Sequence, residues 1–291
     1  MQLAALQATG MQGEYLARSE DATGFGRLVD AMRRGEWSGG NVTVPYKVAA
    51  REQSDWVSPL VRRVGAANTL VRIREGVGAL NTDVDGIAAT LEGHGLDATH
   101  VVLLGAGGAA RAVVEVLSAQ SRRLTVVNRT LSRAAELCAE RAADPGSMVE
   151  SWQALPSTPQ PAWREALEEA LQSATLVIDA AHAGLEAAGD AWSQLPWAAV
   201  DPRAELFDLG YGRAAGGVAR RLGRTSYVDG ATMLLHQGAA AFEAWHARSA
   251  PLEPMRAALA AHLGRRATGI PLVPGAIGRF EQHAAMPARR G

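Results

Sequence analysis

The sequence predicts an α/β protein with two domains, one of which is built on a doubly wound parallel sheet. Its 291 residues are enough for two ordinary domains. Along the second half, short apolar strand-like segments alternate with helix-like segments, which is typical of a parallel sheet with helices on both faces. A Gly-rich turn separates the first of these strands from its helix, as such sheets often require.

Residues 1–95 are predicted to form the smaller α/β domain. Apolar residues three or four positions apart indicate helices, and β-branched runs bounded by turn residues indicate strands. In chain order these patterns predict a helix over 1–10, a strand over 13–18, a helix over 24–37, a short strand over 41–44, a helix with Pro45 at its first position, two strands joined at Glu75–Gly76, and a helix over 84–93.

Residues 96–230 are predicted to form the doubly wound sheet. The expected elements are a strand, a turn and a helix over 100–120, a strand and a helix over 123–143, and short strands within 171–181, 205–211 and 225–230. Two further helices follow, over 231–247 and 251–264. Residues 265–291 carry three prolines and no sustained period, so a flexible tail is expected there.

The amino-acid composition argues against several classes of protein. The 29 basic and 30 acidic residues nearly cancel, so neither a nucleic-acid surface nor a polybasic membrane patch is expected. The single cysteine, Cys138, excludes an internal disulfide and reads as a packed thiol on a helix. No apolar run is long enough for a membrane span and no signal-peptide pattern is present, so we expect a cytoplasmic location. Neither His236 nor His246 has metal-ligand spacing, so no metal is expected.

The Gly-rich turn fits the G-x-G-x-x-A pattern of dinucleotide-binding sheets. It reads Gly105-Ala106-Gly107-Gly108-Ala109-Ala110, after an apolar strand and before a helix. Gly105 would permit the tight turn, Gly107 would let a pyrophosphate approach the backbone, and Ala110 would let helix and strand pack closely. An ordinary strand-to-helix turn is the alternative reading, but the flanking strand and helix favour a phosphate site.

The end of the next strand distinguishes between cofactors. An acidic residue there would hold the ribose hydroxyls of NAD, but this chain has Asn128-Arg129-Thr130. A guanidinium binds a 2′-phosphate with charge-assisted hydrogen bonds. Arg129 therefore predicts NADP(H), with Arg133 one helical turn further on as support, although Arg129 could also be a solvated loop charge.

Lys47 is the candidate for acid–base chemistry. It lies in the first turn of the helix predicted after Pro45, where the partly positive helix end should make a lysine release its proton more readily. Such a lysine suits carbonyl–alcohol chemistry. Asp83 either caps the next helix or faces Lys47 to orient the ammonium group. An exposed lysine reaching into water is the alternative reading.

Hydroxyl and amide groups surround these two residues in the sequence. Thr43, Asn68 and Asn81 all lie in polar segments beside the predicted strands of the first domain. They could bind several alcohol groups of one ligand. Turn and strand-end hydrogen bonds are the alternative explanation for each of them.

Five motifs have the order and spacing of the shikimate dehydrogenase family, and the chain resembles that family from residue 1 to about residue 263. They are NVTVPYK, AANTL, LNTDVDG, GAGGAARA and NRT, and the late segment DGATMLLHQGAAAFEAW is similar as well. The resemblance implies an α/β substrate domain, a Rossmann domain and a C-terminal helix that returns to the first domain. The family reduces 3-dehydroshikimate to shikimate with NADPH, in the biosynthesis of aromatic amino acids.

The resemblance also implies a role for each matching residue. Lys47 and Asp83 would be the catalytic pair. The substrate would be bound by Thr43, Asn68 and Gln237 at its hydroxyls and by Tyr211 at its carboxylate. The cofactor would be bound by Gly105 to Ala110, by Asn128, Arg129, Thr130 and Arg133, and by Gly230.

The chain departs from the family in three places. We expect that the family's opening strand and its Ser-x-Ser loop are missing before Met1. The family's Asn-x-Thr segment is replaced by 179–184, which includes His182, expected to be a loop histidine without a catalytic role. The proline-containing run after Tyr211 is replaced by 212–221.

Two interpretations follow. The first is an active NADP-dependent oxidoreductase acting on shikimate, with quinate as the related substrate. The second is a relative that binds nucleotide without full shikimate turnover. The surviving Lys47, Asp83 and cofactor motifs favour the enzyme. The sequence is compatible with a homodimer and does not determine the oligomeric state.

Overall fold

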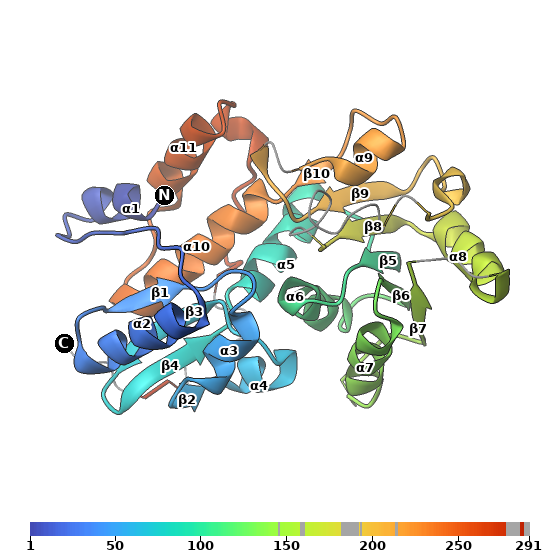
Figure 1. Cartoon of the computed structure of the whole chain (residues 1–291). Coiled ribbons are helices and arrows are strands. Elements are labelled where there is room, and N and C mark those ends of the chain that lie inside the picture. The colour runs from blue at the N-terminus through green and yellow to red at the C-terminus, as the bar shows by residue number, and fades with distance from the viewer. Residues whose placement is uncertain are drawn as a thin grey trace. The chain divides into compact units, whose positions relative to one another are not determined.

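A computed structural model describes residues 1–144, 146–157, 161–181, 192, 194–212, 215–277 and 286–287 (Figure 1). The chain divides into two compact units. The first unit contains Met1–Ala89 and Thr232–Gly291, and the second contains Thr90–Ala231. Because the chain leaves the first unit and later returns to it, two distant stretches of sequence build the same unit.

The first unit contains a four-stranded sheet in the order β1-β3-β4-β2. Its strands are β1 (Gly39–Asn41), β2 (Trp56–Val57), β3 (Thr69–Ile73) and β4 (Gly76–Leu80). β3 pairs with β1 and β4 in antiparallel fashion, whereas β2 and β4 are parallel. The predicted hairpin at Glu75–Gly76 is confirmed, and Gly76 has a φ of 136° that favours glycine.

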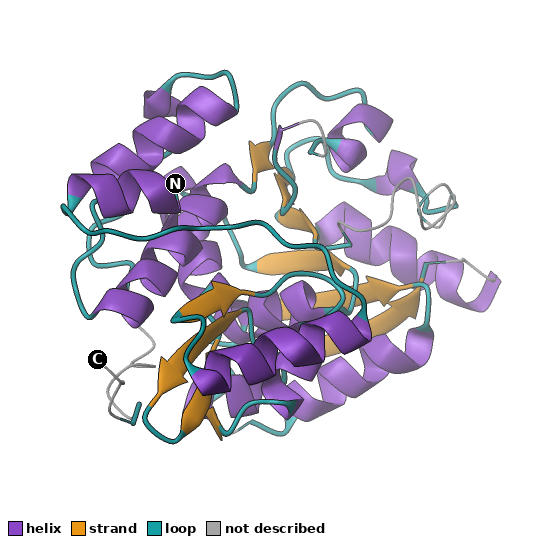
Figure 2. Ribbon diagram, turned by 60° about the vertical axis from the view of Figure 1, so that its left-hand side comes forward, coloured by secondary structure: helices purple, strands orange, loops and turns teal. Residues whose placement is uncertain are grey.

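Helices as well as this sheet build the first unit (Figure 2). They are α1 (Gln2–Ala8), α2 (Ala22–Arg34), α3 (Lys47–Glu52), α4 (Pro59–Val64), α5 (Asp83–His94), α10 (Ala231–His246), α11 (Leu252–His262) and the short 3₁₀ helix η3 (Ala267–Gly269). α2 shows why these helices begin and end where they do. Asp21 accepts the Gly24 N–H at 2.7 Å at its start, and Gly35 ends it in a left-handed conformation.

Two details of this unit differ from the sequence predictions. The strand expected over 13–18 is wrong: the segment is irregular, and Tyr15 and Leu16 are exposed. A strand needs a neighbouring strand to satisfy its backbone, and no described strand pairs with this segment. The helix predicted to start at Pro45 begins two residues later, at Lys47, because residues 44–46 form a turn.

The second unit is a six-stranded parallel sheet in the order β10-β9-β8-β5-β6-β7. The strands are β5 (His100–Leu104), β6 (Arg123–Asn128), β7 (Ser151–Pro156), β8 (Leu176–Asp179), β9 (Glu205–Asp208) and β10 (Val228–Asp229). The strand order reverses direction between β5 and β8. In such a sheet, ligands bind outside the carboxyl ends of the strands at this reversal.

Helices connect the strands of the second unit. They are α6 (Gly108–Leu117), α7 (Leu131–Ala142), α8 (Pro161–Ser173), η1 (Trp197–Ala199) and α9 (Gly217–Arg221). Leu167 of α8 and Val218 of α9 join a buried cluster with Val102 and Val177 of the sheet. The predicted doubly wound parallel sheet is therefore confirmed. β7 and α8 were not predicted. β7 is a partly exposed edge strand without a β-branched run, so its sequence lacks the usual strand pattern.

The tail expected to be flexible from residue 265 onward differs in its first part. Ile270 and Ala276 are fully buried, and Val273 is nearly so. Val273 and Ala276 pack against Ala89 of α5. Their apolar side chains leave water although they belong to no helix or strand that the sequence pattern could have indicated. Among the described residues, no helix is both long and apolar enough to cross a membrane.

Candidate functional site

A buried ion pair joins the two residues expected to do chemistry. Lys47 is the first residue of α3, and Asp83 is the first residue of α5. The Lys47 Nζ lies 2.6 Å from Asp83 Oδ2, and the two side chains are 12% and 5% exposed. Their predicted proximity is confirmed. A short, shielded contact of this kind can hold an ammonium group in one place beside a substrate oxygen.

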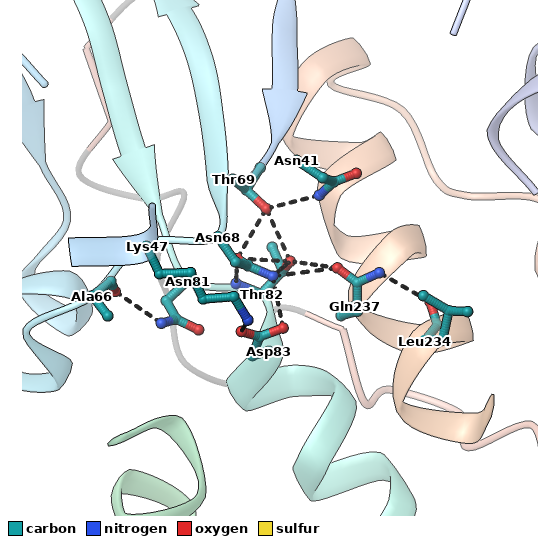
Figure 3. A network of polar contacts seen from close by, with 10 residues as sticks. All are labelled: Asn41, Lys47, Ala66, Asn68, Thr69, Asn81, Thr82, Asp83, Leu234 and Gln237. Carbon is teal, nitrogen blue, oxygen red and sulfur yellow. Dashed lines mark hydrogen bonds and ion pairs between the residues drawn. The ribbon is translucent and has the colours of Figure 1, made fainter. Parts of the chain in front are cut away.

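The Asn68 amide supports the other oxygen of this carboxylate (Figure 3). Asn68 Nδ2 donates to Asp83 Oδ1 at 2.9 Å, and Asn68 Oδ1 accepts the backbone N–H of Thr82 at 2.7 Å. The β3–β4 hairpin explains the proximity, because Asn68 precedes β3 and Thr82 follows β4. Asp83 therefore has a donor on each of its oxygens.

Gln237 joins the same network from the returning helix α10. Its Oε1 lies 3.3 Å from Asn68 Nδ2, and its Nε2 donates to the Leu234 carbonyl at 3.2 Å. Close packing of α10 on α5 makes this contact available. A Cβ on Gly86 would lie 2.5 Å from the Met233 carbonyl oxygen, so the helices need glycine at this position.

Thr43 and Asn81 lie differently. Thr43 is exposed and its carbonyl accepts the Tyr46 N–H at 3.0 Å, so its predicted contact with substrate stays a prediction. Asn81 donates through Nδ2 to the Ala66 carbonyl at 2.8 Å, which ties together the two ends of the hairpin.

Sequence reasoning missed the outer part of the network. Thr69 is completely buried, and its hydroxyl lies 3.0 Å from Asn68 Oδ1 and 3.0 Å from the hydroxyl of Thr82. Asn41 Nδ2 donates to the Thr69 hydroxyl at 3.3 Å. A threonine directly after the motif asparagine was the only signal for it in the sequence.

The Gly-rich turn has the geometry that a dinucleotide requires. Gly105 has a φ of 108°, and a Cβ there would lie 3.2 Å from the Ala181 N. Gly107 precedes α6 and is exposed, with open space where a Cβ would project. Ala110 is fully buried. The backbone at Gly107 is thus open to a phosphate, and the residues present fit a pyrophosphate at the start of α6.

The segment after β6 is exposed at the residues expected to select NADP(H). Arg129, Thr130 and Arg133 are all exposed, and Asn128 Nδ2 donates to the Thr130 carbonyl at 2.9 Å. Gly230 has a structural reason to be glycine: a Cβ there would lie 2.2 Å from the Leu209 carbonyl oxygen. Its predicted cofactor contact stays a prediction.

Two buried carboxyl groups near the reversal point of the sheet were not singled out from the sequence. Asp179 and Asp208 end the neighbouring strands β8 and β9 and are partners in register. Asp208 accepts three backbone N–H groups, from Gly210, Gly216 and Gly217, whereas Asp179 accepts one, from Ala181. Burial, together with the negative charge of Asp208, raises the pKa of Asp179 to about 7.

The remaining predicted residues belong to the second unit or lie outside the description. Tyr211 follows β9 and is exposed. His182 and Gly184 lie outside the described residues. Within the described part of the chain, no group of three or more His, Cys, Asp or Glu side chains could hold a metal ion. Cys138 is buried in α7, and burial raises its pKa to about 11.

Comparison with known proteins places this geometry in a family. Family profiles match residues 1–70 (shikimate dehydrogenase substrate binding domain), 87–155 (shikimate/quinate 5-dehydrogenase) and 230–260 (shikimate 5′-dehydrogenase C-terminal domain). The shikimate dehydrogenase (NADP(+)) of Symbiobacterium thermophilum is 33% identical over 281 residues, covering 91% of this chain and 90% of that protein. The corresponding Caulobacter vibrioides protein is 36% identical over 250 residues, covering 82% and 81%.

A solved structure agrees with these relatives. The shikimate 5-dehydrogenase of Thermus thermophilus, crystallised with NADP(H) and shikimate, matches with a TM-score of 0.69 and 29% identity, covering 90% of this chain and 92% of that chain. The relatives are similar over nearly the whole length, and the segments matched by the family profiles include Lys47 and the Gly-rich turn. The chain belongs to the shikimate dehydrogenase family.

Proposed function

We propose that this protein is an NADP-dependent shikimate dehydrogenase that reversibly reduces 3-dehydroshikimate to shikimate. The observation that carries the proposal is the buried Lys47–Asp83 pair, 2.6 Å apart and held by the Asn68 amide. Removing two opposite charges from water costs free energy that their attraction often does not recover, so stability alone does not favour such a pair.

The chain's own residues supply the acid–base half of the reaction. In the reducing direction the carbonyl oxygen gains negative charge, and the Lys47 ammonium donates a proton to it. Asp83 keeps the ammonium in place through its Oδ2. In the oxidising direction Lys47 takes the proton back from the hydroxyl. The nicotinamide, when bound, supplies or accepts the hydride.

Polar groups around the pair fit a ring that carries several hydroxyls. Asn68 and Gln237 have their amides within the same network as Asp83, and we assign both to ring hydroxyls on the strength of the family resemblance. We assign Thr43 to another ring hydroxyl and Tyr211 to the substrate carboxylate on the strength of the family resemblance. A small polyhydroxy ring acid is the substrate class that these groups suit.

Arg129, with Asn128, Thr130 and Arg133, is proposed to select NADP(H). Arg129 and Arg133 are exposed beside the end of β6, and no acidic residue occupies positions 128–130. The Gly-rich turn is proposed to hold the pyrophosphate. The buried, free thiol of Cys138 suits a reducing cytoplasm, where we place the enzyme.

The test measures the reaction rate of the purified protein with each combination of substrate and cofactor. Shikimate and quinate are each offered with NADP⁺ and with NAD⁺, and absorbance of the reduced nicotinamide is followed. We expect fastest turnover with shikimate and NADP⁺, and turnover slower by about a hundredfold or more for Lys47→Ala under the same conditions. NADPH binding without turnover of either substrate by the wild type would instead support the non-catalytic interpretation.

A further inference from the structure

The hydrogen bonds around the Asn68 amide fix which of its two terminal atoms is the oxygen and which is the nitrogen. The backbone N–H of Thr82 can only donate, and it lies 2.7 Å from Asn68 Oδ1, so this atom must be the oxygen. The Asn68 nitrogen consequently faces Asp83 Oδ1 at 2.9 Å. If the amide turned over, two oxygens would meet at the carboxylate and the contact would become repulsive.

Thr69 adds a second contact to the same amide oxygen. Its hydroxyl lies 3.0 Å from Asn68 Oδ1 and is completely buried. An amide oxygen has two lone pairs, and its two shortest contacts, from the Thr82 N–H and the Thr69 hydroxyl, can fill both, while the Thr82 hydroxyl lies further away at 3.2 Å. Asn68 is also buried, which leaves water little access to replace either donor.

Asn41 sets the direction of the Thr69 hydroxyl. The Tyr15 hydroxyl donates to Asn41 Oδ1 at 2.9 Å, which leaves Asn41 Nδ2 to donate to the Thr69 oxygen at 3.3 Å. A hydroxyl has only one proton. The neighbouring Thr82 hydroxyl, 3.0 Å away, already accepts from Asn68 Nδ2 at 3.1 Å, so the Thr69 proton is available for Asn68 Oδ1. Donors therefore follow one another from Asn41 through Thr69 to Asn68 and Asp83 (Figure 3).

We propose that Thr69 is a positioning residue of the reaction: its hydroxyl, aligned by Asn41, holds the Asn68 amide with its nitrogen toward the Asp83 carboxylate. The proposal rests on the proposed dehydrogenase function. Thr69 acts through Asn68 and needs no contact with substrate. Without the hydroxyl, the amide oxygen keeps the Thr82 N–H at 2.7 Å and only the longer contact to the Thr82 hydroxyl at 3.2 Å. The amide can then tilt away from Asp83, so the carboxylate no longer holds Lys47 in one place.

The test compares Thr69→Val with a matched change elsewhere. Valine has nearly the shape of threonine but no hydroxyl. Thr125→Val is the control, because Thr125 is also buried and its hydroxyl also contacts an amide oxygen, that of Gln153 at 3.2 Å, in the sheet of the second unit. We expect Thr69→Val to lower kcat/KM for shikimate about tenfold, the equivalent of one ordinary hydrogen bond. Thr125→Val should change it less than about twofold, even if both variants lose similar thermal stability.

A double-mutant cycle separates positioning from stability. In an Asn68→Ala background the amide is gone, so Thr69→Val should alter the remaining kcat/KM by less than about twofold. Thr69→Ser keeps the hydroxyl and should recover most of the activity. Equal loss in both backgrounds, or equal activity of the Thr69 and Thr125 valine variants, would overturn the proposal. An inactive wild type would overturn the proposed function, and this inference with it.

Discussion

Replacing Asp179 with asparagine should stabilise the protein, and more so at alkaline than at acid pH. Burial and the charge of Asp208 raise the pKa of Asp179 from 3.8 to about 7, so the folded state holds a proton that the unfolded state releases. Stability from this proton is fully present below about pH 4 and is lost as pH rises through about 7. Asparagine has nearly the same shape and cannot ionise.

The size of the effect follows from the two pKa values. About 1.4 kcal/mol per pKa unit makes the whole penalty on the order of 4 kcal/mol. Most of it accumulates between pH 5 and pH 8, where the wild type should lose roughly 2–3 kcal/mol relative to Asp179→Asn. Above about pH 8 the difference between the two proteins should become constant.

Urea unfolding of the wild type and Asp179→Asn at pH 5, 6, 7 and 8 measures this difference directly. Asp30→Asn is the matched control for removing a carboxylate, since Asp30 lies exposed on α2, where it pairs with Arg33. Parallel pH dependences for the wild type and Asp179→Asn would refute the assignment of a bound proton to Asp179.

Four further predictions concern the site and the nucleotide. Lys47→Ala and Asp83→Asn should each lower kcat about a hundredfold or more while the NADPH dissociation constant, measured by fluorescence, changes little. Arg129→Ala should weaken NADPH binding about tenfold or more and leave NADH binding nearly unchanged, because only NADPH carries the 2′-phosphate. Gly105→Ala should weaken both nucleotides and lower the melting temperature, since the φ of 108° suits glycine. Cys138 should react slowly with thiol reagents at pH 7.5 in the folded protein, because its pKa is raised to about 11.

These predictions can each fail in a distinct way. Normal turnover in either the Lys47 or the Asp83 variant would remove the pair from the mechanism. Equal losses for NADPH and NADH in Arg129→Ala would make Arg129 a bystander. Unchanged nucleotide affinity and melting temperature in Gly105→Ala, or rapid labelling of native Cys138, would contradict the geometry described for those residues.

The sequence predicted those helices, strands and turns whose formation depends on neighbouring residues in the chain. The Gly-rich turn follows an apolar strand, so both the strand and the start of α6 could be placed from neighbouring residues. The hairpin at Glu75–Gly76 is equally local. The irregular segment over 13–18 offers only Tyr15 and Leu16 as strand-forming residues, and strand formation also depends on a partner elsewhere in the chain.

The parts of the site that were missed depend on contacts between distant residues. Thr69 looks like any β-branched strand residue, and only the register of β3 with β4 places its hydroxyl beside Thr82. Asp179 and Asp208 are 29 positions apart, and their pairing requires the strand order of the finished sheet. By contrast, Lys47 and Asp83 each lie at the start of a predicted helix, so both could be singled out locally, and the family resemblance then joined them as a pair.

One hydrogen bond in the site comes from the backbone and does not depend on which side chain occupies position 82. The Thr82 backbone N–H fixes the Asn68 amide, so its contribution is encoded by the path of the chain and not by a codon. Point mutations at position 82 can change the side chain, yet all but proline retain this donor. A substitution of Thr82 therefore removes its side-chain contacts with Asn68 and keeps this backbone contact, whereas a substitution of Thr69 by a residue without a hydroxyl removes its whole contribution.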